Sequence, residues 1–359
     1  MNDVTKILIH STTKIMKDVC TKELVNEAEN GHWAAELWGI LAESGMTTVA
    51  VPESLDGTGG SFTDAYHILR LAGKYAAPIP LAETYMSNWL LADLEMPVST
   101  DPLTILCNEV EPIQFIRTQD GWQITGKAVN VPWARYTKQM LVIGEENSRS
   151  SLAIVSSDDA LIINGQNMAG EARDTVILNH AAVAESRVFS IEAKQVKEWL
   201  LYTGALCRSV MMAGALERIL ELTAAYTSER SQFGKPLHRF QAIQQHLAAM
   251  AGEVTAADIA AQRAIAANEH TPGSKAIAMA KIRINEAAGT VAPIAHQVHG
   301  AIGFTHEHIL HQSTRRVLSW REEWGNETLW AEKLAEQLMQ LADNELWPFL
   351  TEPVVSRQG

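Results

Sequence analysis

The chain has 359 residues, of which 47% are hydrophobic and 20% charged, an ordinary balance for a globular protein with a sizeable core. Its formal net charge of −13 argues against a protein built to bind nucleic acid or an anionic membrane surface. The 3 cysteines, Cys20, Cys107 and Cys207, lie far apart, which favours reduced thiols over a disulfide framework. Charges interrupt every short apolar run near the N-terminus, so we expect a cytoplasmic protein with neither a signal peptide nor a membrane span.

The spacing of apolar residues predicts an N-terminal helical domain over residues 1–98. Trp33, Leu37 and Leu41 form one helical stripe, and Ile68, Leu69 and Ala72 belong to a second. The glycine-rich segment 57–60 between them is expected to be a plain turn, because no Lys followed by Ser or Thr comes after it, as a phosphate-binding loop requires.

Residues 99–191 have a different character and predict a small β domain. Short runs rich in Ile, Val and Leu alternate with polar turns, a spacing typical of an antiparallel barrel or sandwich. The runs lie at 103–107, 114–118, 122–125, 140–143, 153–155 and 174–178.

Residues 192–345 return to helical spacing and predict a C-terminal bundle, followed by a loose tail over 346–359. The helices are long, rich in alanine and apolar on several faces, which indicates contacts between subunits as well as within one. The fold class is therefore α+β and mainly α: a helical domain, a small β-barrel domain and a four-helix bundle.

The stretch 228–246, SERSQFGKPLHRFQAIQQH, carries the strongest local signal. Gly234 and Pro236 separate two helical patterns, and Arg230 lies in the turn between them. A guanidinium beside a helix N-terminus makes a good anion site. On spacing alone, an ordinary turn with a solvated arginine explains the same pattern.

The residue pattern of this stretch resembles a signature of the acyl-CoA dehydrogenase family, whose members carry R-x-x-F-G-(K/R)-x-(L/I)-x-x-x-Q here. A second stretch at 297–307, QVHGAIGFTHE, resembles the family's other signature, Q-x-(H/F)-G-G-x-G-(F/Y)-x-x-E. The segments VPESLDGTGG and APIPLAET also resemble family segments, the second from shorter bacterial members. The resemblance implies an FAD cofactor bound across a subunit boundary, and the residues it implies as contacts are Arg230, Phe233, Gln241, Gln297, Gly300 and Ala301.

A third resemblance lies in the β domain, where GWQITGKAVNVPWA is similar to the family's segment against the flavin ring. It implies flavin contacts for Pro132, Trp133 and Ala134. A buried structural tryptophan, with its N–H bonded to a carbonyl, is the alternative for Trp133. The T-E-P-x-x-G-S segment of longer members is not recognisable here, so no contacts from that loop are assigned.

The family's reaction is α,β-dehydrogenation of an acyl-CoA thioester, in which a carboxylate removes the α proton and the β hydride passes to FAD. The position that usually holds this base is Trp324, and the alternative position is Gly204. Glu323 lies next to the usual position and is the candidate base. The alternative is that Glu322 and Glu323 form a surface pair before a helix capped by Asn326.

Two functions remain open from the sequence. The first is an FAD-dependent acyl-CoA dehydrogenase in fatty acid or steroid side-chain degradation, passing electrons to an electron-transfer flavoprotein. The second is an FAD-holding subunit whose partner chain supplies the base, because some bacterial members that act on bulky ring-bearing acyl-CoAs resemble complexes of two unlike short chains. Either assembly is expected to be a homo- or hetero-tetramer. A relative turned to DNA binding is disfavoured by the acidic charge.

Five histidines crowd into a short stretch and raise the question of a metal site. A zinc site needs ligands that converge on one point, usually together with a cysteine or a carboxylate, and Gly300–Gly303 interrupts the helical geometry between these histidines. We expect no metal, and we expect His308 and His311 to lie on a solvated helix face. The five are His296, His299, His306, His308 and His311.

Overall fold

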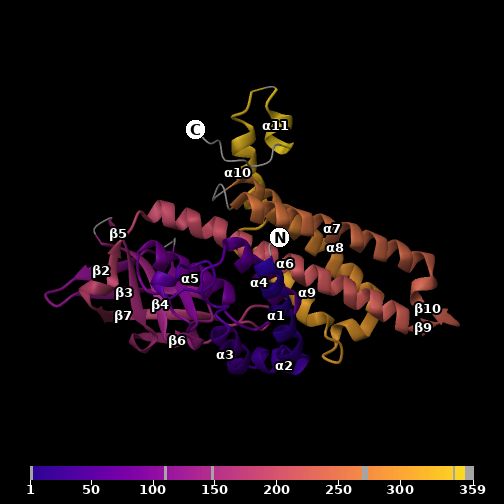
Figure 1. Cartoon of the computed structure of the whole chain (residues 1–359), viewed down its shortest axis with the longest axis horizontal. Coiled ribbons are helices and arrows are strands. Elements are labelled where there is room, and N and C mark those ends of the chain that lie inside the picture. Colours follow the sequence, from indigo (N-terminus) through magenta and orange to yellow (C-terminus); the bar gives the residue numbers. More distant parts are fainter. Residues whose placement is uncertain (1–2, 109–110, 147–148, 269–273, 343, 352–359) are drawn as a thin grey trace. The chain divides into compact units, whose positions relative to one another are not determined.

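The computed structural model describes residues 3–108, 111–146, 149–268, 274–342 and 344–351 (Figure 1). The described residues group into two compact units. The helical unit comprises Met1–Lys22, Tyr66–Ala77 and Leu201–Gly359, and the sheet unit comprises Glu23–Ala65 and Pro78–Leu200. The predicted fold class, mainly helical with a β region, is confirmed. The domain borders near 98, 191 and 345 stay predictions.

The sheet unit is built around one mixed sheet of 8 strands. Their order is β6-β7-β3-β2-β4-β5-β8, and β1 pairs with β4. Within the described residues no pairing joins β6 to β8, so the sheet is open and not the closed barrel that the spacing suggested. The strands are β1 (Leu103–Cys107), β2 (Ile113–Arg117), β3 (Trp122–Pro132), β4 (Gln139–Glu146), β5 (Arg149–Ser156), β6 (Ala160–Ile163), β7 (Arg173–Val183) and β8 (Val188–Ser190).

Most neighbouring strands are antiparallel, as predicted, but β1 and β2 both run parallel to β4. The strands of this sheet form a hydrophobic core from aliphatic side chains at alternate positions, such as Ile124, Val142 and Val176. The short helices of this unit are α2 (Lys22–Glu29), α3 (Ala35–Glu43) and α5 (Leu81–Asp93), with one-turn helices η1 (Glu53–Leu55), η3 (Ser157–Asp159) and η4 (Glu185–Arg187).

The turn after β3, η2 (Ala134–Tyr136), is held by a buried carboxylate. Asp174 on β7 accepts hydrogen bonds from the backbone N–H of Arg135 at 2.9 Å and from its Nε at 2.9 Å. The Asp174 side chain is fully buried, and the Gly165 N–H donates to it as well, at 3.2 Å. This network fixes the turn next to residues 132–134, for which the sequence resemblance implies contacts with a flavin.

The helical unit contains long helices, of which α7 and α8 lie side by side (Figure 1). A hairpin of β9 (Ser231–Gln232) and β10 (Lys235–Pro236) lies where α6 leads into α7. The helices are α1 (Asp3–Val19), α4 (Phe62–Lys74), α6 (Ala193–Glu229), α7 (Gln241–Asn268), α8 (Lys275–His299), α9 (Leu310–Glu322), α10 (Glu327–Leu338) and α11 (Leu346–Thr351), with one-turn helices η5 (Leu237–Arg239) and η6 (Gly300–Phe304).

Ion pairs and a close backbone contact join α4 to α6 and α7. Arg70 on α4 pairs with Glu217 on α6 at 2.8 Å and with Asp258 on α7 at 2.7 Å. A Cβ at Gly214 would lie 2.0 Å from the carbonyl oxygen of Arg70, so only glycine permits this crossing. Among the described residues α6 is the one helix long and apolar enough to cross a membrane, but 89% of the relevant window is buried inside the protein.

We predict that Asp174→Ala lowers the free energy of unfolding by about 3–5 kcal/mol, because it leaves Arg135 half-buried without its carboxylate. The measurement is chemical unfolding of the purified protein. The matched control is Asp101→Ala, which removes an exposed pair with Lys138 and should cost less than about 1 kcal/mol. Equal losses in the two variants would contradict the buried network.

Candidate functional site

The first sequence motif forms an exposed hairpin directly after α6. Phe233 and Gly234 occupy the two turn positions with φ of 51° and 80°, the left-handed pair that a tight two-residue hairpin needs. Phe233, at the tip of the hairpin, is 93% exposed. The turn therefore holds an exposed aromatic side chain in a backbone conformation that is uncommon for a residue other than glycine.

Further groups of the first motif gather beside this tip. Phe240 lies 6.2 Å from Phe233 in an edge-to-face arrangement, and the ammonium of Lys235 lies 4.3 Å from the Phe240 ring. Arg230 and Gln241 are both exposed, and Gln241 begins α7. The hairpin therefore offers a guanidinium, an amide and two rings next to the positive end of a helix.

The second motif surrounds the end of α8. Gln297, Gly300 and Ala301 are exposed, and Gly300 has φ 64° and ψ −146°, a backbone conformation essentially restricted to glycine. A Cβ at Gly300 would meet no atom within 4 Å, so the backbone here faces open space. Phe304 is also exposed and stacks on His296 at 4.2 Å.

Tyr226, on the last turn of α6, brings the two motifs together. Its hydroxyl donates to the carbonyl of His299 at 3.3 Å, and the two rings stack at 4.4 Å. Tyr226 was not predicted from the sequence, where its only signal is an aromatic residue one turn before Arg230.

His299 itself is held neutral. Its Nδ1–H donates to the carbonyl of Ala295 at 2.8 Å, and burial lowers its pKa to about 4. Its Nε2 is buried and has no hydrogen-bond partner among the described residues. The second motif therefore contains an imidazole lone pair that is available as an acceptor.

The third predicted segment lies in the sheet unit and is largely buried. Trp133 has φ 57° and is 5% exposed, and its backbone N–H donates to Ala172 at 3.2 Å. Ala134 is fully buried and Pro132 pairs with Arg173. The Trp133 residue is therefore buried, and both the flavin contacts of this segment and the structural alternative for the Trp133 ring stay predictions.

The candidate base Glu323 lies at the end of α9 and is bound in an ion pair. Arg208 on α6 donates from Nε to Oε2 of Glu323 at 2.6 Å. The arginine side chain is 2% exposed and the glutamate side chain 19%. A carboxylate that neutralises a buried guanidinium is poorly suited to accept a substrate proton, because the arginine would then lose its counter-charge.

The two positions at which the resemblance predicts a base, the usual one at 324 and the alternative one at 204, contact each other. Trp324 has φ 57°, and a Cβ placed on Gly204 would lie 2.3 Å from the indole Cδ2 of Trp324. The indole therefore fills the space that a side chain at 204 would need. One position carries a ring without an acid or base, and the other has no side chain at all.

Buried polar groups fix the turn that carries Trp324. Lys281 on α8 donates to the carbonyls of Trp320 at 2.8 Å and Arg321 at 3.2 Å, which cap the end of α9. Burial lowers the pKa of Lys281 to about 7.

Two further groups hold the segment that follows α9. Trp330 donates from its indole N–H to the carbonyl of Trp324 at 2.9 Å. Asn326 caps α10 by accepting from the N–H of Leu329 at 3.2 Å, as the sequence predicted.

The histidine stretch shows no metal geometry. No group of three or more His, Cys, Asp or Glu side chains among the described residues could hold a metal ion. The prediction of a solvated face for His308 and His311 was wrong. His311 is buried and bonds to Arg315, and His308 Nδ1 accepts the N–H of Leu310 at the start of α9, because α9 packs this end into the unit.

Comparison with known proteins agrees with the motifs. Residues 195–339 match the family described as "Acyl-CoA dehydrogenase, C-terminal domain". The chain is 28% identical over 330 residues to Acyl-CoA dehydrogenase FadE27 of Mycobacterium tuberculosis, covering 83% of this chain and 87% of that one. It is 26% identical over 314 residues to Acyl-CoA dehydrogenase IpdE2 of Mycolicibacterium smegmatis, covering 86% and 90%.

A solved structure gives the same result. The ChsE4-ChsE5 complex from Mycobacterium tuberculosis matches with a TM-score of 0.86 and 26% identity, covering 95% of this chain and 99% of the matched chain. The resemblance recognised from the sequence is thus confirmed: residues 195–339 match the C-terminal domain of the acyl-CoA dehydrogenase family, and most of the chain is similar to proteins named acyl-CoA dehydrogenases.

We predict that Gly204→Ala lowers the free energy of unfolding by about 1–3 kcal/mol, because the added methyl group overlaps the Trp324 indole. In a Trp324→Ala background the same change should cost almost nothing, and a double-mutant cycle measures this coupling. Gly252→Ala on α7 is the control, because a Cβ there meets no atom within 4 Å. Additive effects of the two substitutions would show that the contact is absent.

We predict a pH dependence of stability from Lys281. Because burial lowers its native pKa from 10.5 to about 7, the unfolded state binds one more proton between these values. Wild type should therefore gain about 1 kcal/mol per pH unit above pH 7 relative to Lys281→Met. Urea unfolding between pH 7 and 9 measures this, with the exposed Lys14→Met as control. Parallel profiles for wild type and Lys281→Met would refute it.

Proposed function

We propose that this chain is the FAD-holding, base-free subunit of a heteromeric acyl-CoA dehydrogenase. The observation that carries the proposal is the contact between Trp324 and Gly204. The two positions that would supply the base are used for packing against each other. The remaining candidate, Glu323, neutralises a buried arginine.

The described residues of the helical unit fit an FAD cofactor. Arg230 can hold a pyrophosphate, since a guanidinium next to a helix N-terminus suits phosphate oxygens. Phe233 offers an exposed face for stacking, and Gln241 and Gln297 offer exposed amides. The unpartnered Nε2 of His299 accepts a hydrogen bond from a hydroxyl or N–H donor.

The exposure of these groups also supports an assembly of more than one chain. Phe233 and Phe304 are exposed aromatics at the two motifs, and both would be buried by a cofactor and a neighbouring subunit. The similarity to a solved complex of two named chains, ChsE4 and ChsE5, supports a hetero-oligomer over a homotetramer.

Bound FAD would supply the two-electron acceptor for dehydrogenation of the thioester. The residues of this chain would bind and orient that cofactor. Removal of the α proton requires a carboxylate near the substrate in a site that excludes water, and we assign that carboxylate to the partner chain. Transfer of electrons to an electron-transfer flavoprotein and a cytoplasmic location belong to the same proposal.

The alternative is a lone enzyme with Glu323 as base. Its specific support is the position of Glu323 next to the usual base position. The two functions differ in a direct assay of the purified chain, with and without a co-expressed second acyl-CoA dehydrogenase homologue.

We predict that the chain alone shows no acyl-CoA-dependent reduction of an electron acceptor, and that co-expression with the correct partner restores it. In the active complex, Glu323→Gln should leave turnover per folded complex within about twofold, although it lowers stability because it removes the carboxylate charge that pairs with the buried Arg208. A loss of about a thousandfold in a folded complex would identify Glu323 as the base instead.

FAD binding by this chain can be measured separately from the identity of the catalytic base. Arg230→Ala should weaken FAD binding by about tenfold or more, because a charge-assisted contact to phosphate is lost. Arg239→Ala, an exposed arginine a few residues further on, is the matched control and should retain FAD. Equal flavin content in both variants would contradict the assignment of Arg230.

A further inference from the structure

A cavity of about 560 Å³ lies within the helical unit, lined by residues of α1, the end of α4, α6 and the start of α9. We call it the α1 cavity. None of the residues assigned to FAD lines it. Its volume is in the range of small-molecule sites.

The charge of this cavity is opposite to that of the chain. Its lining contains the cations Lys17, Lys22, Lys74 and Arg218 and one carboxylate, Glu221, whereas the whole chain carries −13. Positive charges concentrated in a concave site focus the electrostatic field there, and this field attracts anions.

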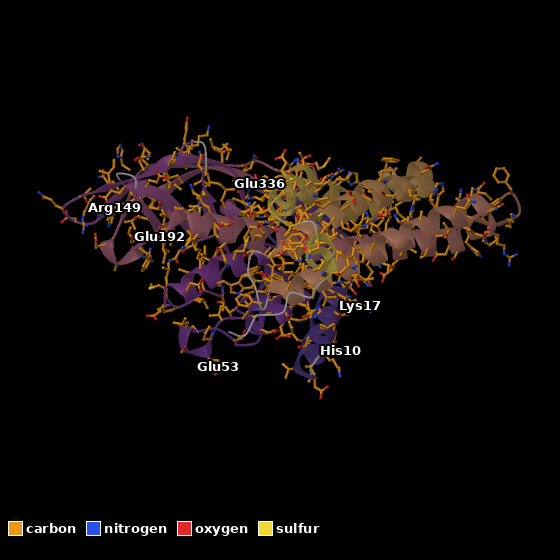
Figure 2. All side chains as sticks on the ribbon, turned by 90° about the horizontal axis from the view of Figure 1, so that it is seen from above. His10, Lys17, Glu53, Arg149, Glu192 and Glu336 are labelled. Atoms are coloured by element: carbon orange, nitrogen blue, oxygen red, sulfur yellow. The ribbon has the colours of Figure 1, made fainter. Side chains whose placement is uncertain are left out.

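Carboxylates satisfy only part of this positive charge. Lys74 pairs with Glu221 at 2.6 Å and with Glu217 at 2.7 Å, and Arg218 shares Glu221 at 3.4 Å. In the described part of the chain Lys17 makes no ion pair, and Lys22 donates only to the carbonyl of Glu307, at 3.1 Å. Lys17 projects from α1, on the same helix as His10 (Figure 2).

The pKa of the neighbouring His308 is affected by the same positive charges. Burial lowers the pKa of His308, and the charges of Lys22 and Arg218 lower it further. The two cations therefore act on a common region at the rim of the cavity.

The chemistry of the lining points to phosphate oxygens. Lysine ammonium groups bind phosphate as point charges, and the hydroxyl groups of Thr13 and Ser313 add donors. The one arginine, Arg218, is already engaged with Glu221, so bidentate recognition of a carboxylate ligand is disfavoured.

We propose that the α1 cavity binds a small phosphorylated molecule through Lys17 and Lys22. This site is separate from the flavin motifs and does not depend on the proposed function. It gives the chain a second ligand, held by Lys17 of α1 and by Lys22 at the start of α2.

The test is calorimetric titration of inorganic pyrophosphate into the FAD-saturated protein at constant ionic strength. We expect saturable binding, weakened about tenfold or more by Lys17→Ala and by Lys22→Ala. Lys14→Ala removes the same charge from the same helix outside the cavity and should change the dissociation constant by less than about twofold.

Three results would overturn the proposal. They are the absence of saturable binding, equal weakening by Lys14→Ala and Lys17→Ala, and binding that is lost in Arg230→Ala but kept in Lys17→Ala. The last result would place the pyrophosphate at the flavin motif. Because the lysines at 14 and 17 are exposed, their replacement should leave the fold intact, which thermal unfolding checks.

Discussion

The indole of Trp324 lies against the bare backbone of Gly204, and a methyl group at 204 would overlap the ring at 2.3 Å. This contact joins the end of α9 to α6 and involves both positions at which the sequence resemblance predicts a catalytic base. Packing of this kind is specific in shape, since only glycine leaves room for the ring. The same contact packs the helical unit and places no acidic or basic side chain at either position.

The surrounding groups make the turn rigid. Lys281 caps the carbonyls at the end of α9, Arg208 binds Glu323, and the indole N–H of Trp330 binds the carbonyl of Trp324. A shift that moved Glu323 into a substrate site would break its ion pair with the buried guanidinium of Arg208. The two sequence motifs differ from this turn, because side chains such as Phe233 and Phe304 are exposed there.

The sequence predicted what is encoded locally. Both motifs, the strand runs at β1 to β5 and β7, and the cap at Asn326 are local patterns, and the structure contains them. Strands β6 and β8 were missed because one exposes Leu161 and Ile163 and the other has 3 residues. Contacts between distant segments, such as Tyr226 with His299 and Trp324 with Gly204, have no local signal. The cations of the α1 cavity were missed for the same reason.

The central claim is that this chain holds the flavin but lacks the base. The most direct test is to mix the FAD-loaded chain anaerobically with a panel of acyl-CoA thioesters and to follow the flavin absorbance. The account predicts no bleaching by any thioester with the chain alone, and bleaching by at least one of them after the partner chain is added. Bleaching of the flavin by the chain alone would contradict it.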